Sequence, residues 1–119
     1  MENFKTDCLI IGGGVAGIAC AKHLAQKYDD IYLIEKNNAL GLETSSRNSE
    51  VTHAGIYYKK NSLKSKLCIR AKVKGENDFI IDVKNFTTKT AINILGYISP
   101  GLTSSFALGE YVKSLLNDH

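Results

Sequence analysis

The sequence predicts an α/β fold built on a parallel βαβ unit, and three features of its first 35 residues indicate this. An apolar stretch at 7–11 is typical of a short buried strand. Gly12, Gly14 and Gly17 interrupt it, and a second apolar stretch at 31–34 follows about twenty residues later. Because a helix that connects two neighbouring strands leaves them parallel, we expect a right-handed crossover between them.

The segment between the two strands has the pattern of a helix from 15 to about 28. Its apolar residues recur near the helical period on one side, at Ile18, Ala21, Leu24, Ala25 and Tyr28. Asp29 and Asp30 end this helix, and the second strand ends at Glu35. The first third of the chain therefore contains the opening strand, helix and strand of an α/β domain.

The remaining chain predicts a loop, two helices and two strands. Residues 37–60 are polar and punctuated by glycines, as in a surface loop. Apolar residues at helical spacing follow Ser62 and predict a helix of roughly three turns that ends at Gly75. Short strands are expected at 79–83 and 91–98. A closing helix over 102–116 follows the sequence "SPG".

Composition and charge favour a folded domain without nucleic acid as a partner. The 119 residues fit one domain, and the net charge of +3 is too small to argue for nucleic acid. Cys8, Cys20 and Cys68 are widely spaced and predict a reducing, cytoplasmic location without a metal site. The start of the chain resembles no signal peptide, and no apolar run approaches the roughly 20 residues of a membrane span. Peripheral membrane contact stays open.

Gly12, Gly14 and Gly17 form the pattern G-x-G-x-x-G directly between a strand and a helix. In dinucleotide-binding folds these glycines provide a tight turn, close approach to a pyrophosphate and close helix–strand contact. Glu35 lies eighteen positions after Gly17, at the end of the second strand, where its carboxylate can accept hydrogen bonds from ribose hydroxyls and repel a 2′-phosphate. The pattern predicts FAD or NAD rather than NADP, against the alternative of a structural glycine turn and a solvated acid.

Two further blocks resemble flavin oxidoreductases of the D-amino-acid oxidase superfamily. "ETSSRNSEVTHAGIYY" at 43–58, followed by "SLKSKLC" at 62–68, is similar to a segment of the L-2-hydroxyglutarate dehydrogenase/oxidase group, and "SPGLTSSFALGEYV" at 99–112 is similar to the C-terminal block of that group. The resemblance implies a partial Rossmann-like FAD-binding domain. It also implies FAD as the cofactor and oxidation of a small 2-hydroxy acid, L-2-hydroxyglutarate, to the 2-oxo acid.

The resemblance assigns the remaining site residues. Within a run of polar donors that starts at Thr44 and Ser45, the residues that would anchor pyrophosphate and flavin edges are Ser46, Arg47, Asn48 and Ser49. The residues that would open a helix facing the flavin and stabilise negative charge on it are Gly101, Leu102, Thr103 and Ser104. His53 would accept the substrate hydroxyl proton or contact the flavin. The alternative is a polar loop and an ordinary capped helix.

Members of this group are several times longer, and the resemblance implies that the chain lacks their middle, including the substrate domain. We therefore expect one truncated FAD-binding domain over 1–119, with a nucleotide-binding part at 1–75 and a flavin-facing strand and helix at 76–119. Sheet edges left open would promote self-association. Two alternatives remain: a non-catalytic remnant that keeps part of the FAD-binding unit, and an NAD-binding module, which would leave "SRNSEVTHAG" without a role.

Overall fold

The structure is a computed structural model, and it describes residues 5–47, 74–75, 78–97 and 100–116. Its elements are, in chain order, β1 (Cys8–Ile11), α1 (Val15–Leu24), β2 (Ile31–Ile34), the 3₁₀ helix η1 (Thr44–Arg47), β3 (Ile80–Asn85), β4 (Thr90–Leu95) and α2 (Gly101–Leu115). The helix predicted after Ser62 lies outside the described residues. None of the helices in the described ranges has the length and apolar composition needed to cross a membrane.

The predicted βαβ unit is confirmed. β1 and β2 pair in parallel, with Cys8 opposite Ile31 and Ile11 opposite Ile34. The helix between them ends at Leu24, four residues earlier than predicted, and the chain continues in turns in which the Tyr28 N–H donates to the Leu24 carbonyl at 3.0 Å. The helical spacing of the apolar residues therefore extends past the end of the helix itself.

The second half of the described chain forms an antiparallel hairpin. β3 pairs with β4 from Ile80 opposite Leu95 to Asn85 opposite Thr90, and the Phe86 N–H donates to the Lys89 carbonyl at 2.8 Å in the turn. Both strands include polar residues that the prediction left in the connection. These residues are tolerated because side chains alternate across a strand, so that one face of the hairpin stays in water.

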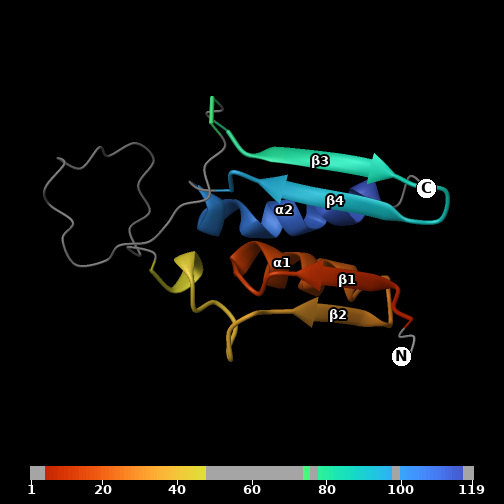
Figure 1. Cartoon of the computed structure of the whole chain (residues 1–119), viewed down its shortest axis with the longest axis horizontal. Coiled ribbons are helices and arrows are strands. Elements are labelled where there is room, and N and C mark those ends of the chain that lie inside the picture. Colours follow the sequence, from red (N-terminus) through yellow and green to blue (C-terminus); the bar gives the residue numbers. More distant parts are fainter. Residues whose placement is uncertain (1–4, 48–73, 76–77, 98–99, 117–119) are drawn as a thin grey trace, which may run out of the picture.

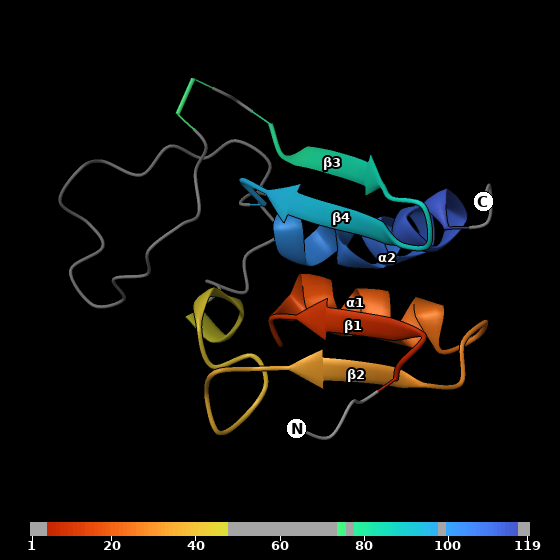
Figure 2. The same ribbon diagram turned by 45° about the vertical axis from the view of Figure 1, so that its right-hand side comes forward.

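The core lies where α1 and α2 pack together. Cys20 and Leu24 of α1 are buried with Leu108 and Val112 of α2, and partly buried residues of both sheets pack against them. Figures 1 and 2 show the two helices side by side on the same side of both strand pairs. At Gly109 a Cβ atom would lie 2.6 Å from the Ala19 carbonyl oxygen, so the glycine permits the close approach of the helices.

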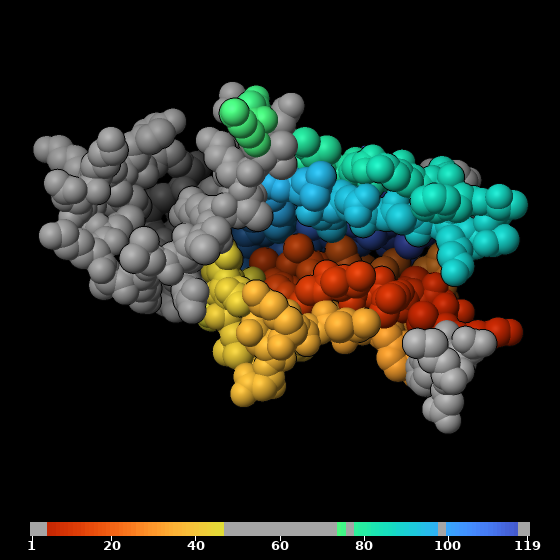
Figure 3. All heavy atoms as spheres, in the orientation of Figure 1, coloured from red at the N-terminus to blue at the C-terminus, as the bar shows by residue number. Residues whose placement is uncertain are grey.

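The two strand pairs do not join into one sheet within the described residues. β1 and β4 run beside each other in the same direction (Figures 1 and 2), but neither is hydrogen-bonded to the other. A cavity of about 1730 Å³ extends along both strands, and the α2 residue Val112 is among those that line it. In the space-filling view the blue surface of α2 is visible between the red residues of β1 and the light-blue residues of β4 (Figure 3).

Candidate functional site

The glycine turn joins β1 to α1 and depends on two of its glycines for different reasons. Gly12 has a φ of 107°, a region that favours glycine, and its N–H donates to the Ile34 carbonyl at 2.8 Å, which ties the turn to β2. A Cβ at Gly17 would overlap the Gly12 carbonyl oxygen and would lie 3.4 Å from Cγ2 of Ile10. The turn therefore holds the start of α1 directly against the end of β1.

Glu35 follows β2 and lies against the same turn. Its Oε2 accepts a hydrogen bond from the Gly13 N–H at 2.7 Å, and its Oε1 accepts from both the backbone and the side-chain nitrogen of Asn37 at 2.9 Å. The backbone hydrogen bonds from Asn37 and Gly13 lower the pKa of the Glu35 carboxyl, and burial opposes this in part. The side chain is therefore an ionised acceptor beside the glycine turn.

The loop after Glu35 folds back over the turn. The Gly41 N–H donates to the Gly13 carbonyl at 2.9 Å, and the Val15 N–H, at the start of α1, donates to Ser45 Oγ at 2.9 Å. Ser45 thus caps a helix that begins thirty residues earlier in the chain. Ser46, by contrast, donates to the carbonyl oxygens of Leu42 and Glu43 and remains exposed.

The start of α2 contributes a second helix N-terminus. Its N-cap, Pro100, makes no side-chain capping hydrogen bond, since proline carries no donor or acceptor there. Gly101 is buried, Leu102 and Thr103 are exposed, and Ser104 is half-buried with its Oγ donating to the Pro100 carbonyl at 3.0 Å. The first N–H groups of any α-helix lack partners within the helix, so this end of α2 presents backbone donors.

One cavity connects these features. The residues that line it include Gly12, Gly14, Gly17, Ser45, Gly101 and Leu102. In Figures 1 and 2 the first turns of α1 and α2 lie at the same end of the molecule, next to η1. The cavity therefore runs past two helix N-termini, each with a partial positive charge that favours an anionic ligand.

The structure brings some of the predicted site residues together and leaves others untested. The three glycines of the pattern line one cavity with Gly101 and Leu102 of α2, and Glu35 contacts the glycine turn through the Gly13 amide. Arg47 is the last residue of η1, and Asn48, Ser49 and His53 lie outside the described residues. The sequence identifies Ser45 only as part of a polar run, whereas in the structure its hydroxyl accepts a hydrogen bond from the first residue of α1.

Another residue at the cavity was not among the predicted site residues. Tyr97, which follows β4, lines the cavity, and its hydroxyl reaches the first turn of α2. Its position four residues before Gly101 is the only signal in the sequence, and this spacing has no particular meaning outside a helix.

Comparison with known proteins gives matches to the first part of the chain. The family model described as "FAD dependent oxidoreductase" (DAO) matches residues 7–76. The mitochondrial L-2-hydroxyglutarate dehydrogenase of Arabidopsis thaliana is 46% identical over 68 residues, which are 57% of this chain and 14% of that protein. The protein of the same name from Caenorhabditis elegans is 46% identical over 67 residues, 55% of this chain and 16% of that protein.

The human L-2-hydroxyglutarate dehydrogenase, also named as mitochondrial, is 41% identical over 66 residues, which are 54% of this chain and 14% of that protein. The matched part of the chain thus corresponds to about a seventh of the length of these relatives. No solved structure matches the chain. The glycine turn, Glu35 and Ser45 fall within the family match, and α2 lies beyond it.

Proposed function

Because the chain belongs to the FAD dependent oxidoreductase family, we propose that it binds FAD along the cavity between the glycine turn and the start of α2. The observation that carries this proposal is that both features line the same cavity. The glycine turn would hold the pyrophosphate, since Gly14 carries no side chain that would keep a phosphate from the backbone. The amides at the start of α1 would donate to it.

Glu35 would hold the ribose of the adenosine half. Its carboxylate is ionised at neutral pH and lies within 2.7 Å of the Gly13 amide, so a ribose bound beside the glycine turn would be within its reach. A negative charge at this place accepts hydrogen bonds from ribose hydroxyls and repels a 2′-phosphate. FAD and NAD therefore fit this end of the site better than NADP.

The isoalloxazine end of FAD would lie toward Gly101, Leu102, Thr103 and Ser104. Backbone N–H groups and the positive end of the α2 dipole would favour negative charge on that ring. Ser46, Arg47, Asn48 and Ser49 would flank the flavin from the loop that contains η1. When bound, FAD accepts the hydride that leaves the substrate.

The proposed reaction is oxidation of a 2-hydroxy acid, with L-2-hydroxyglutarate as the proposed substrate, because the relatives carry that compound in their names. His53 would take the proton of the substrate hydroxyl, since imidazole has a pKa suited to such a transfer at neutral pH. The alternative is a chain that binds FAD and turns nothing over, since the match covers about a seventh of the relatives. An NAD-binding module is the third possibility.

The domain boundaries, the location and the assembly of the chain are also proposals. We propose one FAD-binding domain over 1–119, in the cytoplasm, with self-association through exposed apolar strands. Leu9, Ile11, Tyr32 and Ile34 supply such a surface on β1 and β2, with Ile11 83% exposed.

Flavin binding tests the proposal directly. The purified chain is mixed with FAD, excess ligand is removed, and the visible spectrum is recorded before and after L-2-hydroxyglutarate is added without oxygen. Bound flavin that bleaches supports the oxidoreductase, bound flavin that stays yellow supports the remnant, and NAD binding without flavin supports the NAD module. Glu35→Gln is expected to weaken FAD binding, whereas Glu110→Gln, on the exposed face of α2, is expected to leave it unchanged.

A further inference from the structure

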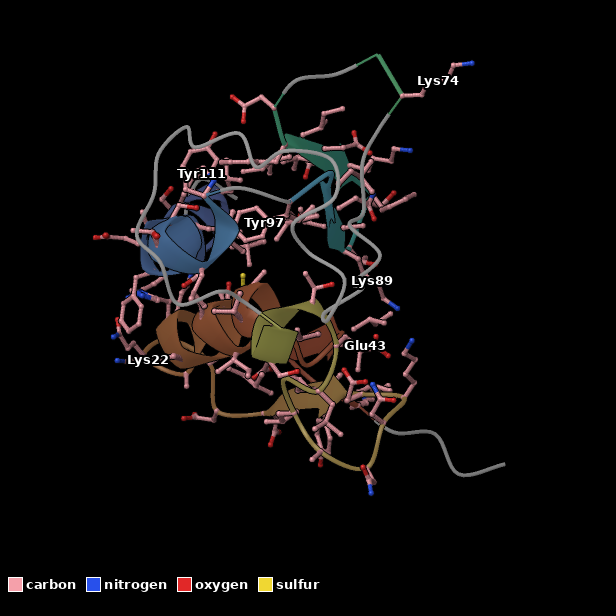
Figure 4. The ribbon with its side chains drawn as sticks, turned by 90° about the vertical axis from the view of Figure 1, so that its left-hand side faces the viewer. Lys22, Glu43, Lys74, Lys89, Tyr97 and Tyr111 are labelled. Atoms are coloured by element: carbon pink, nitrogen blue, oxygen red, sulfur yellow. The ribbon has the colours of Figure 1, made fainter. Side chains whose placement is uncertain are left out.

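Tyr97 lies directly against the first turn of α2. Its ring packs closely on the first helical position, because a Cβ at Gly101 would lie 3.1 Å from Cε1 and 3.2 Å from Cδ1 of the tyrosine. The ring of Phe79 packs edge-on against Tyr97 with a centroid distance of 5.0 Å. Figure 4 shows Tyr97 between α2 and the β3–β4 hairpin. The ring therefore connects the hairpin to the beginning of the helix.

The hydroxyl of Tyr97 is bonded to the same turn. It donates to the Gly101 carbonyl oxygen at 2.7 Å and lies 2.9 Å from Ser104 Oγ, which in turn lies 3.0 Å from the Pro100 carbonyl oxygen. The hydroxyl groups of Tyr97 and Ser104 thus make three contacts, and all three lie at the start of α2. Burial raises the pKa of Tyr97, so the phenol stays protonated at neutral pH and available as a donor.

These contacts fix the start of α2 without using its backbone N–H groups. The groups that Tyr97 and Ser104 engage are two carbonyl oxygens and a hydroxyl. The N–H donors of Gly101, Leu102 and Thr103, which have no partners within the helix, are left for a ligand. Tyr97, Gly101 and Leu102 line the same cavity as the glycine turn, so a ligand in that cavity can reach these donors.

We propose that Tyr97 is a positioning residue that holds the first turn of α2 in place for the isoalloxazine end of FAD. This inference rests on the proposed function. Tyr97 acts through the helix, and the hydroxyl of Ser104 belongs to the same clamp, while the Ser104 N–H donates to the Pro100 carbonyl at 3.0 Å. The adenosine end of the site, at the glycine turn and Glu35, is independent of Tyr97.

The test compares the affinities of FAD and ADP for the wild-type chain, Tyr97→Phe and the control Tyr111→Phe, by isothermal titration calorimetry. Tyr97→Phe keeps the ring and its packing on Phe79 and Gly101, and circular dichroism verifies the fold. Loss of one hydrogen bond predicts FAD binding that is roughly three- to tenfold weaker, with ADP binding unchanged. Tyr111 is on α2 and 50% exposed, so its variant is expected to match wild type for both ligands.

Hydrogen exchange adds a measurement that does not need FAD. In Tyr97→Phe the amides of Ser104 and Ser105 are expected to exchange faster than in wild type, and Ser104→Ala is expected to have the same effect. In the double variant Tyr97→Phe/Ser104→Ala, the loss of FAD affinity is expected to be smaller than the sum of the losses in the two single variants. Both residues belong to one clamp, so either change already weakens it.

The failure of the inference and the failure of the proposed function are distinguishable. A wild-type chain that binds no FAD overturns the proposed function and this inference with it. A wild-type chain that binds FAD, together with a Tyr97→Phe chain of equal FAD affinity, overturns only the inference. Equal weakening of FAD and ADP by Tyr97→Phe also overturns it, because the residue would then act through the fold as a whole.

Discussion

Replacement of Gly17 by alanine separates the demands of the glycine turn from those of the helix. Gly17 is the third residue of α1, where alanine is more favourable than glycine by about 1 kcal/mol in helix propensity. The structure predicts the opposite outcome, since the new Cβ would overlap the Gly12 carbonyl oxygen and lie 3.1 Å from the Gly12 carbonyl carbon. Backbone atoms cannot rotate away, so the helix and β1 must separate.

The size of the effect follows from these two contributions. Overpacking of a tight site costs typically about 1–3 kcal/mol, and contact with a fixed backbone belongs near the upper end of that range. After the gain in propensity is subtracted, Gly17→Ala is expected to lower the free energy of unfolding by about 2 kcal/mol. For a domain of this size that corresponds to a fall in Tm of roughly 10 °C.

Urea and thermal denaturation followed by far-UV circular dichroism measure this change. Ala107→Gly is the matched control, because Ala107 is exposed on α2 and the variant reports helix propensity alone, a loss of about 1 kcal/mol. If Gly17→Ala is as stable as wild type or more stable, helix propensity dominates, and the close approach of α1 to the glycine turn is not the reason for the glycine.

Three further predictions concern Glu35, Ser45 and Ile11. The lowered pKa of Glu35 means that its stabilising contribution is complete above the usual value of 4.5 and is lost as the pH falls through the lower folded value. The Tm difference between wild type and Glu35→Gln should therefore be constant near neutral pH and shrink as the pH falls below about 4.5, and a difference that does not shrink there would contradict this. Ser45→Ala removes the cap on the Val15 amide and should lower the free energy of unfolding, measured by chemical denaturation, by about 1 kcal/mol. The control Ser46→Ala changes an exposed residue and should lower it by less than about 0.5 kcal/mol. Equal losses in the two variants would count against the cap. Ile11→Lys places a charge on a residue that is 83% exposed and should raise the monomer fraction in sedimentation velocity, unless the apolar face of β1 and β2 plays no part in association.

The parts of the fold that were predictable from sequence depend on local patterns. Continuous apolar stretches, a glycine pattern and helical spacing identify β1, α1 and β2 because each pattern is complete within a few residues of the chain. Element ends were less predictable: α1 stops at Leu24 although apolar residues continue to Tyr28 at helical spacing. The turns after Leu24 bury part of Tyr28 without being helical, and spacing alone does not distinguish the two conformations.

The contacts that complete the candidate site join distant residues. Ser45 caps Val15, thirty positions earlier in the sequence, and Gly109 packs against the Ala19 carbonyl, ninety positions earlier. Neither pair has a spacing that a sequence pattern reveals, because the distance between their atoms depends on how α1 and α2 pack. The resemblance implies that the start of the last helix lies beside the nucleotide, which stays a prediction; Gly101 and Leu102 line the same cavity as the glycine turn.

Packing of the two helices links the core of the protein to its candidate site. Because Gly109 lets α2 approach the Ala19 carbonyl, the helices lie side by side, and their N-termini reach the same end of the cavity (Figures 1 and 2). Two neighbouring positive helix ends repel each other, and an anion bound between them is stabilised by both. Ser45 and Tyr97 bring oxygen atoms to these two ends, Ser45 on an N–H group and Tyr97 on a carbonyl. A dinucleotide that binds here therefore meets, at α1, a Val15 N–H that Ser45 already occupies, whereas at α2 it meets donors that Tyr97 has left available.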